Sequence, residues 1–403
     1  MSIVPIRAAA SRPTIGDLVS RATAIGAFVR EQAEQTEANR KVPAETIARM
    51  REAGLFRVMQ PAVYGGYEYG FDALAQIVAP IGAGCGSTGW IFSLYITHQW
   101  LTATFSKQAQ DEYFATPDVI AAGSYAPVGR AIAVDGGYRL SGTWGFTSGC
   151  DYAHWLFLGG MIPPASEGLP PKPAFFLVPR ADVSIDDNWF TMGLAGTGSK
   201  NTVASDIFVP SHRVVPVADL FAGTTPGAKV HSNPVYRQSM MSALPFALVA
   251  PIFGMAQGAL ADFLDMAKVR TTRGAVAGGN NRMAEFATIQ SRVAEATGSI
   301  EAARLMMFDR LAKAMAAATA DEQGSLDMRL MNRLSQAFSV RLLVQAIDAL
   351  FLAAGGQGIF TGKPLQRAWR DAHAGAVHVS MNWDAVSTMY GQYALGLEPK
   401  GQY

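Results

Sequence analysis

The chain has 403 residues, of which 49% are hydrophobic and 16% are charged. A chain of this length and apolar content can bury a large core and is expected to divide into two or three packed units. Its formal net charge of +1 offers no attraction to a polyanion, which argues against nucleic acid binding.

Cysteine and histidine usage bounds the compartment and the metal chemistry. Cys85 and Cys150 fit no metal-binding or redox spacing, so we expect a reduced, cytoplasmic compartment. The N-terminal segment has no apolar stretch before a small-residue cleavage site, which predicts no secretion signal. The six histidines are scattered without an HxD or ExxH pair, so we expect no metal site and no metal oxygenase.

The beginning of the chain has the spacing of helices. Apolar residues recur at helical intervals between positions 14 and 53, and a second helix within this range is expected to open at Pro43. Further helices are predicted near residues 71–79 and 90–105.

Three glycines between the last two of these helices fit the pattern GxGxxG, namely Gly84, Gly86 and Gly89. A dinucleotide-binding loop requires a preceding strand, and the segment before these glycines is helical in pattern. We therefore interpret them as positions where helices approach one another closely.

The pattern changes to strands between residues 119 and 210. Asp135-Gly136-Gly137 lies between alternating apolar residues and predicts a β-hairpin, because the turn positions need φ > 0. The second strand of this hairpin ends in an unusual cluster of aromatic, hydroxyl and glycine residues: Trp144, Phe146, Thr147, Ser148 and Gly149.

Long apolar helices are predicted over residues 240–264, 290–317 and 330–354. The first is long enough for a membrane span to be considered. Pro245, Pro251 and its many small residues favour instead a buried helix of a bundle.

This order of helical, β and helical regions resembles the acyl-CoA dehydrogenase fold, and motifs over nearly the whole chain carry the resemblance. In chain order they are Gly142-Thr143-Trp144 with Phe146 and Ser148-Gly149, Gly193-Leu194 with Gly196-Thr197-Gly198-Ser199, Arg270 before Arg273-Gly274, and Gly355-Gly356-Gln357-Gly358 followed by Arg370-Asp371. An aromatic residue that is usual near Arg270 is missing. The resemblance implies an α+β chain with an N-terminal helical domain (1–118), a central β-barrel domain (119–225) and a C-terminal four-helix bundle (226–403) that builds a homotetramer.

Two chemistries occur on this fold. The dehydrogenases remove a proton with a carboxylate, and many carry a Glu after the Arg-Asp pair, where this chain has His373 and His378 and no Glu. The chain is more similar to the flavin-dependent oxygenases of two-component systems, such as those that act on p-hydroxyphenylacetate, on a steroid-derived catechol and on dibenzothiophene. The residues that carry this similarity are His98 with Trp100, Gly123-Ser124, Trp144 to Gly149, and His378 after Arg370-Asp371.

The similarity implies a reduced flavin, FMN or FADH2, which a separate reductase supplies and which forms a C4a-hydroperoxide with O2. Loss of the N5 proton would release H2O2, and a hydroxyl such as Ser148 suits that position. Arg270 offers a bidentate partner for the flavin phosphate. The residues expected to hold the flavin are Ser124, Trp144, Phe146, Thr147, Ser148, Arg270, Gly355, Gly356 and Gln357.

Oxygen transfer to an aromatic ring is electrophilic, so a base that draws the proton from a phenol or an indole-type N–H activates the ring. His98 or His378 can serve as this base, and with Ser148 they are the expected catalytic residues. Apolar residues favour a flat aromatic substrate. The expected substrate contacts are Tyr95, Trp100 and Tyr125.

The sequence therefore predicts the oxygenase component of a two-component flavin-dependent monooxygenase that hydroxylates a small phenol- or indole-type compound. We expect a dry cavity between the β domain and the helices, with Ser148 opposite His378. An acyl-CoA dehydrogenase-type oxidoreductase, an N- or S-oxygenase on the same fold, and a non-enzymatic protein remain alternatives. The expected partners are a transiently bound flavin reductase and further copies of the chain, with no nucleic acid and no membrane.

Overall fold

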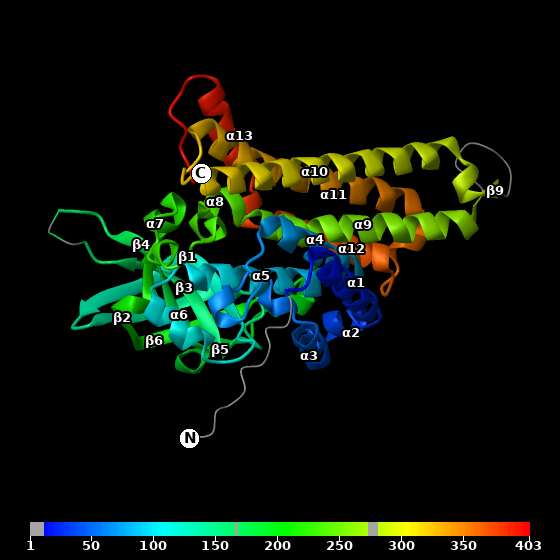
Figure 1. Ribbon diagram of the computed structural model, residues 1–403. Coiled ribbons are helices and arrows are strands. Elements are labelled where there is room, and N and C mark those ends of the chain that lie inside the picture. The colour runs from blue at the N-terminus through cyan, green and yellow to red at the C-terminus, as the bar shows by residue number, and fades with distance from the viewer. Residues whose placement is uncertain (1–11, 165, 167, 273–280) are drawn as a thin grey trace.

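The structure is a computed structural model that describes residues 12–164, 166, 168–272 and 281–403. A β-sheet lies on one side of the molecule, and long helices extend away from it to the other side (Figure 1). The N-terminal helices lie beneath these long helices in the same view.

The N-terminal region is helical, as predicted. Thr14 caps the first helix, because its hydroxyl accepts from the backbone N–H of Asp17 while the Asp17 carboxylate accepts from Thr14. The helices are α1 (Ile15–Glu31), α2 (Ala33–Ala38), α3 (Ala44–Glu52), α4 (Phe71–Gly84), α5 (Gly86–Ala103) and α6 (Lys107–Phe114).

Helix α5 passes through the interior. All of its residues except Leu94 are buried, because it contacts α4, α9 and the sheet on its different sides. A helix that is apolar on every face belongs in a core. The functional residues that α5 carries are therefore held by packing.

The glycines between α4 and α5 permit close packing of helices, as the sequence predicts. A Cβ atom at Gly84 would lie 2.1 Å from the carbonyl oxygen of Gly26 on α1. One at Gly89 would lie 2.6 Å from the Cα of Gly82. The GxGxxG segment joins two helices, and what directly precedes it is helix α4 and not a strand.

The described strands of the central region form a seven-stranded open sheet in the order β5-β6-β2-β1-β3-β4-β7. Among these described strands, β1 and β3 pair in parallel and the other neighbours are antiparallel. The expected barrel is wrong, because β5 and β7 stand at opposite edges and do not pair with each other. The strands are β1 (Ala121–Val134), β2 (Gly137–Thr147), β3 (Trp155–Ile162), β4 (Lys172–Pro179), β5 (Ser184–Asp186), β6 (Lys200–Pro210) and β7 (Val214–Pro216).

The predicted hairpin connects β1 to β2. Val134 pairs with Gly137, which leaves Asp135 and Gly136 as a two-residue turn with Gly136 at φ +75°. Farther along, the register between β2 and β6 shifts between Trp144 and Thr147. This register shift is a β-bulge, and it changes the direction in which the side chains at the end of β2 point.

The C-terminal helices are α7 (Val217–Ala222), α8 (Met240–Ala243), α9 (Phe246–Val269), α10 (Ala287–Thr319), α11 (Leu326–Ala354), α12 (Pro364–Ala376) and α13 (Trp383–Ala394), with a small ribbon of β8 (Thr271–Thr272) and β9 (Asn281–Arg282). Helix α9 packs on α11, α12 and, most extensively, α4 of the N-terminal region. The C-terminal helices and α4 thus form one helical layer, and the expected four-helix bundle is not confirmed as a separate unit.

Two helical segments, Met240–Val269 and Leu326–Ile359, are long and apolar enough to cross a membrane by length and composition. In the first, 89% of the apolar window is buried within the fold, so tertiary packing accounts for its apolar character. In the second the share is 44%, which leaves apolar side chains of α11 on the surface of a single chain.

The contact between α1 and α4 makes Gly84→Ala a test of the helix packing. The added methyl group would meet the Gly26 carbonyl, so we expect the free energy of unfolding to fall by about 1–3 kcal/mol. Urea denaturation followed by circular dichroism measures this change. Gly16→Ala is the matched control, because Gly16 lies exposed on α1 and its Cβ would meet only the Thr14 hydroxyl at 3.7 Å. A Gly84→Ala protein as stable as this control would contradict the packing.

Candidate active site

Ser148 is the first of three buried residues whose hydroxyl groups are hydrogen-bonded in series, here called the hydroxyl chain. Its Oγ lies 2.7 Å from Ser199 Oγ, which lies 2.6 Å from Thr197 Oγ1. Thr197 Oγ1 in turn donates to the carbonyl oxygen of Leu194 over 2.8 Å. Ser199 and Thr197 belong to the Gly196–Ser199 motif, and the sequence assigned no role to their hydroxyls.

The carbonyl at the end of this chain sets the direction of every bond in it. A carbonyl only accepts, and each hydroxyl has one hydrogen to donate. Thr197 gives its hydrogen to Leu194, so Ser199 must donate to Thr197 and Ser148 must donate to Ser199. The Ser148 oxygen is therefore left with free lone pairs and can accept a hydrogen bond from a ligand.

Phe146 lies beside Ser148 in an unusual conformation. Its side chain is 73% exposed, and its φ of +61° lies in the left-handed region that bulky residues rarely adopt. Its ring meets the edge of Trp189, with 5.7 Å between ring centroids. Strain of this kind is typical of ligand sites, so this exposed ring is a candidate wall for a planar group.

The other residues at the end of β2 pack inward. Trp144 is fully buried in the core of the sheet, where its indole N–H donates to the Gly159 carbonyl oxygen over 2.7 Å. Thr147 is also fully buried, with its hydroxyl 3.1 Å from that of Thr202. Both side chains therefore pack within the chain, and their contact with a flavin stays a prediction.

Ser124 ties the two strands of the hairpin together. Its hydroxyl on β1 donates to the carbonyl oxygen of Gly145 on β2 over 2.7 Å. This bond uses its only hydrogen, so Ser124 can offer a ligand only an acceptor.

His98 and Tyr125 form a hydrogen-bonded pair between α5 and β1. His98 Nδ1 lies 2.6 Å from the Ala121 carbonyl oxygen and must donate to it, so Nε2 carries the lone pair and accepts from the Tyr125 hydroxyl at 2.8 Å. Burial lowers the pKa of His98 to about 4. His98 is therefore a neutral imidazole that reaches a ligand only through Tyr125.

Two further predicted substrate contacts, Tyr95 and Trp100, support the protein itself. Tyr95 is fully buried and donates to the Gly149 carbonyl oxygen over 2.7 Å, which holds the turn after Ser148. Trp100 is fully buried, donates to the Val235 carbonyl oxygen and packs on Phe71. Both side chains therefore hold backbone segments in place, and their direct contact with a substrate stays a prediction.

His378 follows α12 and begins the short helix η10 (Val379–Met381). Its Nδ1 accepts from the backbone N–H of Ser380 at 3.2 Å, so the neutral ring carries its hydrogen on Nε2. Its ring lies 5.9 Å from the ring of Trp90 on α5. Burial and then the charge of Arg333 lower the pKa of His378 to about 4.

The short helix η4 (Ala195–Thr197) lies between the hydroxyl chain of Ser148 and helix α12, which precedes His378. The backbone N–H of Leu194, just before η4, donates to the carboxylate of Asp371 on α12 over 2.6 Å. A Cβ at Gly86, in the first turn of α5, would lie 2.7 Å from the other oxygen of Asp371. Asp371 and His378 thus lie beside the N-terminal half of α5, and Leu194 joins Asp371 to the hydroxyl chain of Ser148.

Arg270 lies beside the segment that follows α11. Arg270 caps the C-terminal end of α9, and its guanidinium donates to the carbonyl oxygen of Ala354 over 2.6 Å. A Cβ at Gly355 or Gly356 would meet open space, which leaves the backbone of both residues accessible. Arg273-Gly274 lies outside the described residues.

This second group lies far from Ser148. Helix α9 has 24 residues and is therefore about 36 Å long. Its last turn lies beside β9, across the molecule from the sheet (Figure 1). The predicted flavin residues therefore fall into two groups within one chain.

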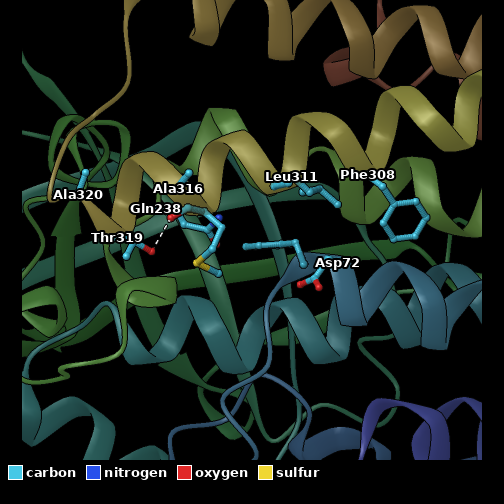
Figure 2. A pocket seen from close by; sticks show the side chains of 10 residues that line it. Asp72, Gln238, Phe308, Leu311, Ala316, Thr319 and Ala320 are labelled. Carbon is cyan, nitrogen blue, oxygen red and sulfur yellow. Dashed lines mark hydrogen bonds between the residues drawn. The ribbon is translucent and has the colours of Figure 1, made fainter.

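A cavity of about 720 Å³ opens elsewhere, between α10 and the start of α4. Phe308 and Leu311 project from α10 near Asp72 on α4, with Gln238 farther along (Figure 2). A second cavity of about 520 Å³ continues beyond Phe308. Neither cavity is lined by the predicted site residues, so neither is the expected space between Ser148 and His378.

Two family descriptions match the chain. Residues 22–118 match the N-terminal domain of acyl-CoA dehydrogenase, and residues 246–383 match its C-terminal domain. The chain is 46% identical over 392 residues to the oxygenase component of the FADH(2)-dependent resorcinol hydroxylase from Rhizobium sp. (strain MTP-10005), covering 96% of each chain.

Solved structures have the same fold. The crystal structure of 3-HSA hydroxylase from Rhodococcus sp. RHA1 superposes with a TM-score of 0.90 at 36% identity, covering 96% of this chain and 98% of that chain. XiaF from Streptomyces sp., in complex with FADH2 and glycerol, superposes with a TM-score of 0.87 at 26% identity, covering 96% of this chain and 97% of that chain.

The buried carboxyl group of Asp371 predicts how the stability of the folded chain depends on pH. Burial raises its pKa to about 6, so the folded chain favours the protonated acid, and stability is lost as pH rises from about 4 to 6. Asp371→Asn keeps an acceptor for Leu194 but cannot ionise. We expect this variant to gain about 3 kcal/mol relative to the unaltered chain between pH 4 and 7. Urea denaturation at these pH values measures the difference, and a difference independent of pH would refute the assignment.

Proposed function

The chain belongs to the acyl-CoA dehydrogenase family and, within it, to the oxygenase components of flavin-dependent two-component monooxygenases, and on this basis we propose how its residues carry out the reaction. It is an oxidoreductase that hydroxylates an aromatic compound with O2 and a reduced flavin, FADH2 or FMN, supplied by a separate reductase. For this chain we propose a phenol- or indole-type substrate.

The residues present fit a reduced flavin. Ser148 has free lone pairs, and the neighbouring Phe146 presents an exposed ring to a planar group. Arg270 supplies a cation beside the open backbone of Gly355 and Gly356, which suits a phosphate. When bound, the reduced flavin activates O2 and supplies an electrophilic oxygen atom.

We propose that Ser148 Oγ accepts a hydrogen bond from the N5–H group of the flavin. This bond keeps the hydrogen on N5. Because the Ser199 and Thr197 hydroxyls are both committed as donors, the Ser148 hydrogen is already used, and only its lone pairs face the ligand. As long as this hydrogen stays on N5, the release of H2O2 is opposed. The hydroxyl chain thus supports this role by its direction alone.

We propose that His98 acts on the substrate through Tyr125. The Tyr125 hydroxyl donates to His98 Nε2, so its oxygen can accept from the hydroxyl of a phenol. A proton moving from the substrate toward His98 makes the ring more nucleophilic. Because burial holds the pKa of His98 near 4, the pair polarises the substrate hydroxyl and does not retain the proton.

We propose that the flavin is bound between copies of the chain in a homotetramer. In one chain, Arg270 and Ser148 lie at distant ends, and a second copy can bring its Arg270 to the first copy's sheet. Large apolar side chains surround the Arg270 end and are exposed in a single chain, which is typical of an interface. They are Val269, Leu352, Ile359 and Phe360, exposed by 80%, 76%, 64% and 56%.

The test of the function uses the purified chain with chemically reduced flavin and O2. With resorcinol or indole as substrate, we expect oxygen from 18O2 to enter an aromatic product. With an acyl-CoA as substrate we expect no product. With NADH and oxidised flavin we expect no turnover until an unrelated flavin reductase is added. An enoyl-CoA product, or rapid NADH oxidation by the chain alone, would contradict the proposal.

The shared flavin site is tested by mixing two defective chains. Ser148→Val should release H2O2 in place of product, and Arg270→Gln should weaken flavin binding. When the two variants are co-expressed in equal amounts, about a quarter of sites combine an intact Ser148 with an intact Arg270 from another copy. We expect product formation to recover to about that fraction, and no recovery would show that each chain holds its own flavin.

A further inference from the structure

Arg333 is a buried cation without a carboxylate partner among the described residues. It lies on α11 and is 4% exposed. Its guanidinium donates to the side-chain oxygen of Gln336 and to the carbonyl oxygens of Ser380 and Gln402, the last two over 3.1 and 3.2 Å. All three acceptors are neutral. Burying an unpaired charge is unfavourable, so the position calls for a compensating function.

Two hydrogen bonds connect this cation to His378 through one residue. The Ser380 carbonyl oxygen accepts from Arg333, and the Ser380 N–H donates to His378 Nδ1. These bonds join α11 to the turn η10 and fix the imidazole relative to the helix. Because Nδ1 is occupied as an acceptor, the ring hydrogen must lie on Nε2.

Within the part of the chain that the structure describes, no group near His378 favours a second proton on its ring. From α5 the ring meets Trp90, which does not ionise, and from α11 it meets the charge of Arg333. Among the described residues, Arg333 is the charged group that acts on this imidazole, and it acts to lower the pKa. A positive charge here therefore opposes imidazolium formation.

We propose that Arg333 is a positioning residue that holds His378 as a neutral imidazole with its hydrogen on Nε2. His378 then donates a hydrogen bond at the reacting centre and does not remove a proton. This revises the expected choice between two histidine bases, because His98 presents a lone pair through Tyr125 whereas His378 presents an N–H. The role of His378 in the reaction rests on the proposed function. The protonation state of its ring rests on the hydrogen bonds described above.

The ring state is measured without flavin, by solid-state 15N NMR of protein labelled only in histidine. The His378→Gln spectrum identifies the signal. We expect the unaltered protein to show an Nε2–H ring that stays neutral down to pH 5. In Arg333→Gln the midpoint of protonation should rise by at least about one pH unit, because the cation is lost. Arg333→Lys keeps the charge and should keep the ring neutral at pH 5.

Arg329→Gln is the matched control. Arg329 lies one turn earlier on α11, where it contacts the ring of Tyr403 and makes no bond to Ser380. We expect its His378 signal to be unchanged. An Nδ1–H ring or a midpoint near 6.5 in the unaltered protein would overturn the proposal, and so would an Arg333→Gln signal equal to that of the control. If Arg333→Gln does not fold, protonation of His378 above pH 6 in Arg333→Lys would overturn it.

A second measurement connects the ring state to the reaction. With chemically reduced flavin, product per flavin in Arg333→Gln should fall about tenfold between pH 7.5 and 4, as His378 becomes charged, against about twofold in the Arg329→Gln control. An equal profile in both variants would overturn the role of Arg333. No product from the unaltered chain at any pH would instead refute the proposed function, and the NMR result would still decide the state of the ring.

Discussion

The complete burial of α5 is the constraint on which the rest of the structure depends. A buried polar side chain needs a partner within the protein, and α5 carries several. Ser93 donates to a carbonyl oxygen of α9, Gln99 donates to the Val119 carbonyl oxygen just before β1, and Tyr95 donates to Gly149 after β2. These bonds attach the sheet and α9 to the same helix, so α5 fixes the end of β2 relative to the C-terminal helices.

Hydrogen-bond direction then determines the chemistry that each site residue offers. Carbonyl oxygens end the chains that begin at Ser148 and at Tyr125, and a backbone N–H occupies Nδ1 of His378. As a result Ser148 offers an acceptor, Tyr125 offers an acceptor backed by His98, and His378 offers a donor. None of these assignments depends on a shift in pKa, although the low pKa values of both histidines agree with neutral rings.

Among the described residues, two features that a single chain leaves unsatisfied bear on the proposed site. Arg333 lacks a counter-ion among the described residues, beside His378, and the apolar surface around Arg270 lacks a cover. We explain the unpaired charge of Arg333 by its effect on the His378 imidazole. We explain the exposed apolar surface around Arg270 by contact with another copy of the chain. Both are costs to the folded monomer, and such costs commonly mark functional sites.

Periodicity and turn chemistry in the sequence determined the helices, the hairpin at Asp135-Gly136 and the close helix contacts at the glycines, because these depend on neighbours along the chain. The motifs likewise indicated the family and the importance of Ser148, His98 and His378. Only the tertiary structure decided that the sheet is open, that Trp144 and Trp100 face inward, and which nitrogen of each histidine carries the hydrogen. Those properties depend on residues distant in sequence, such as Ser199 for Ser148 and Arg333 for His378, and local patterns carry no record of such contacts.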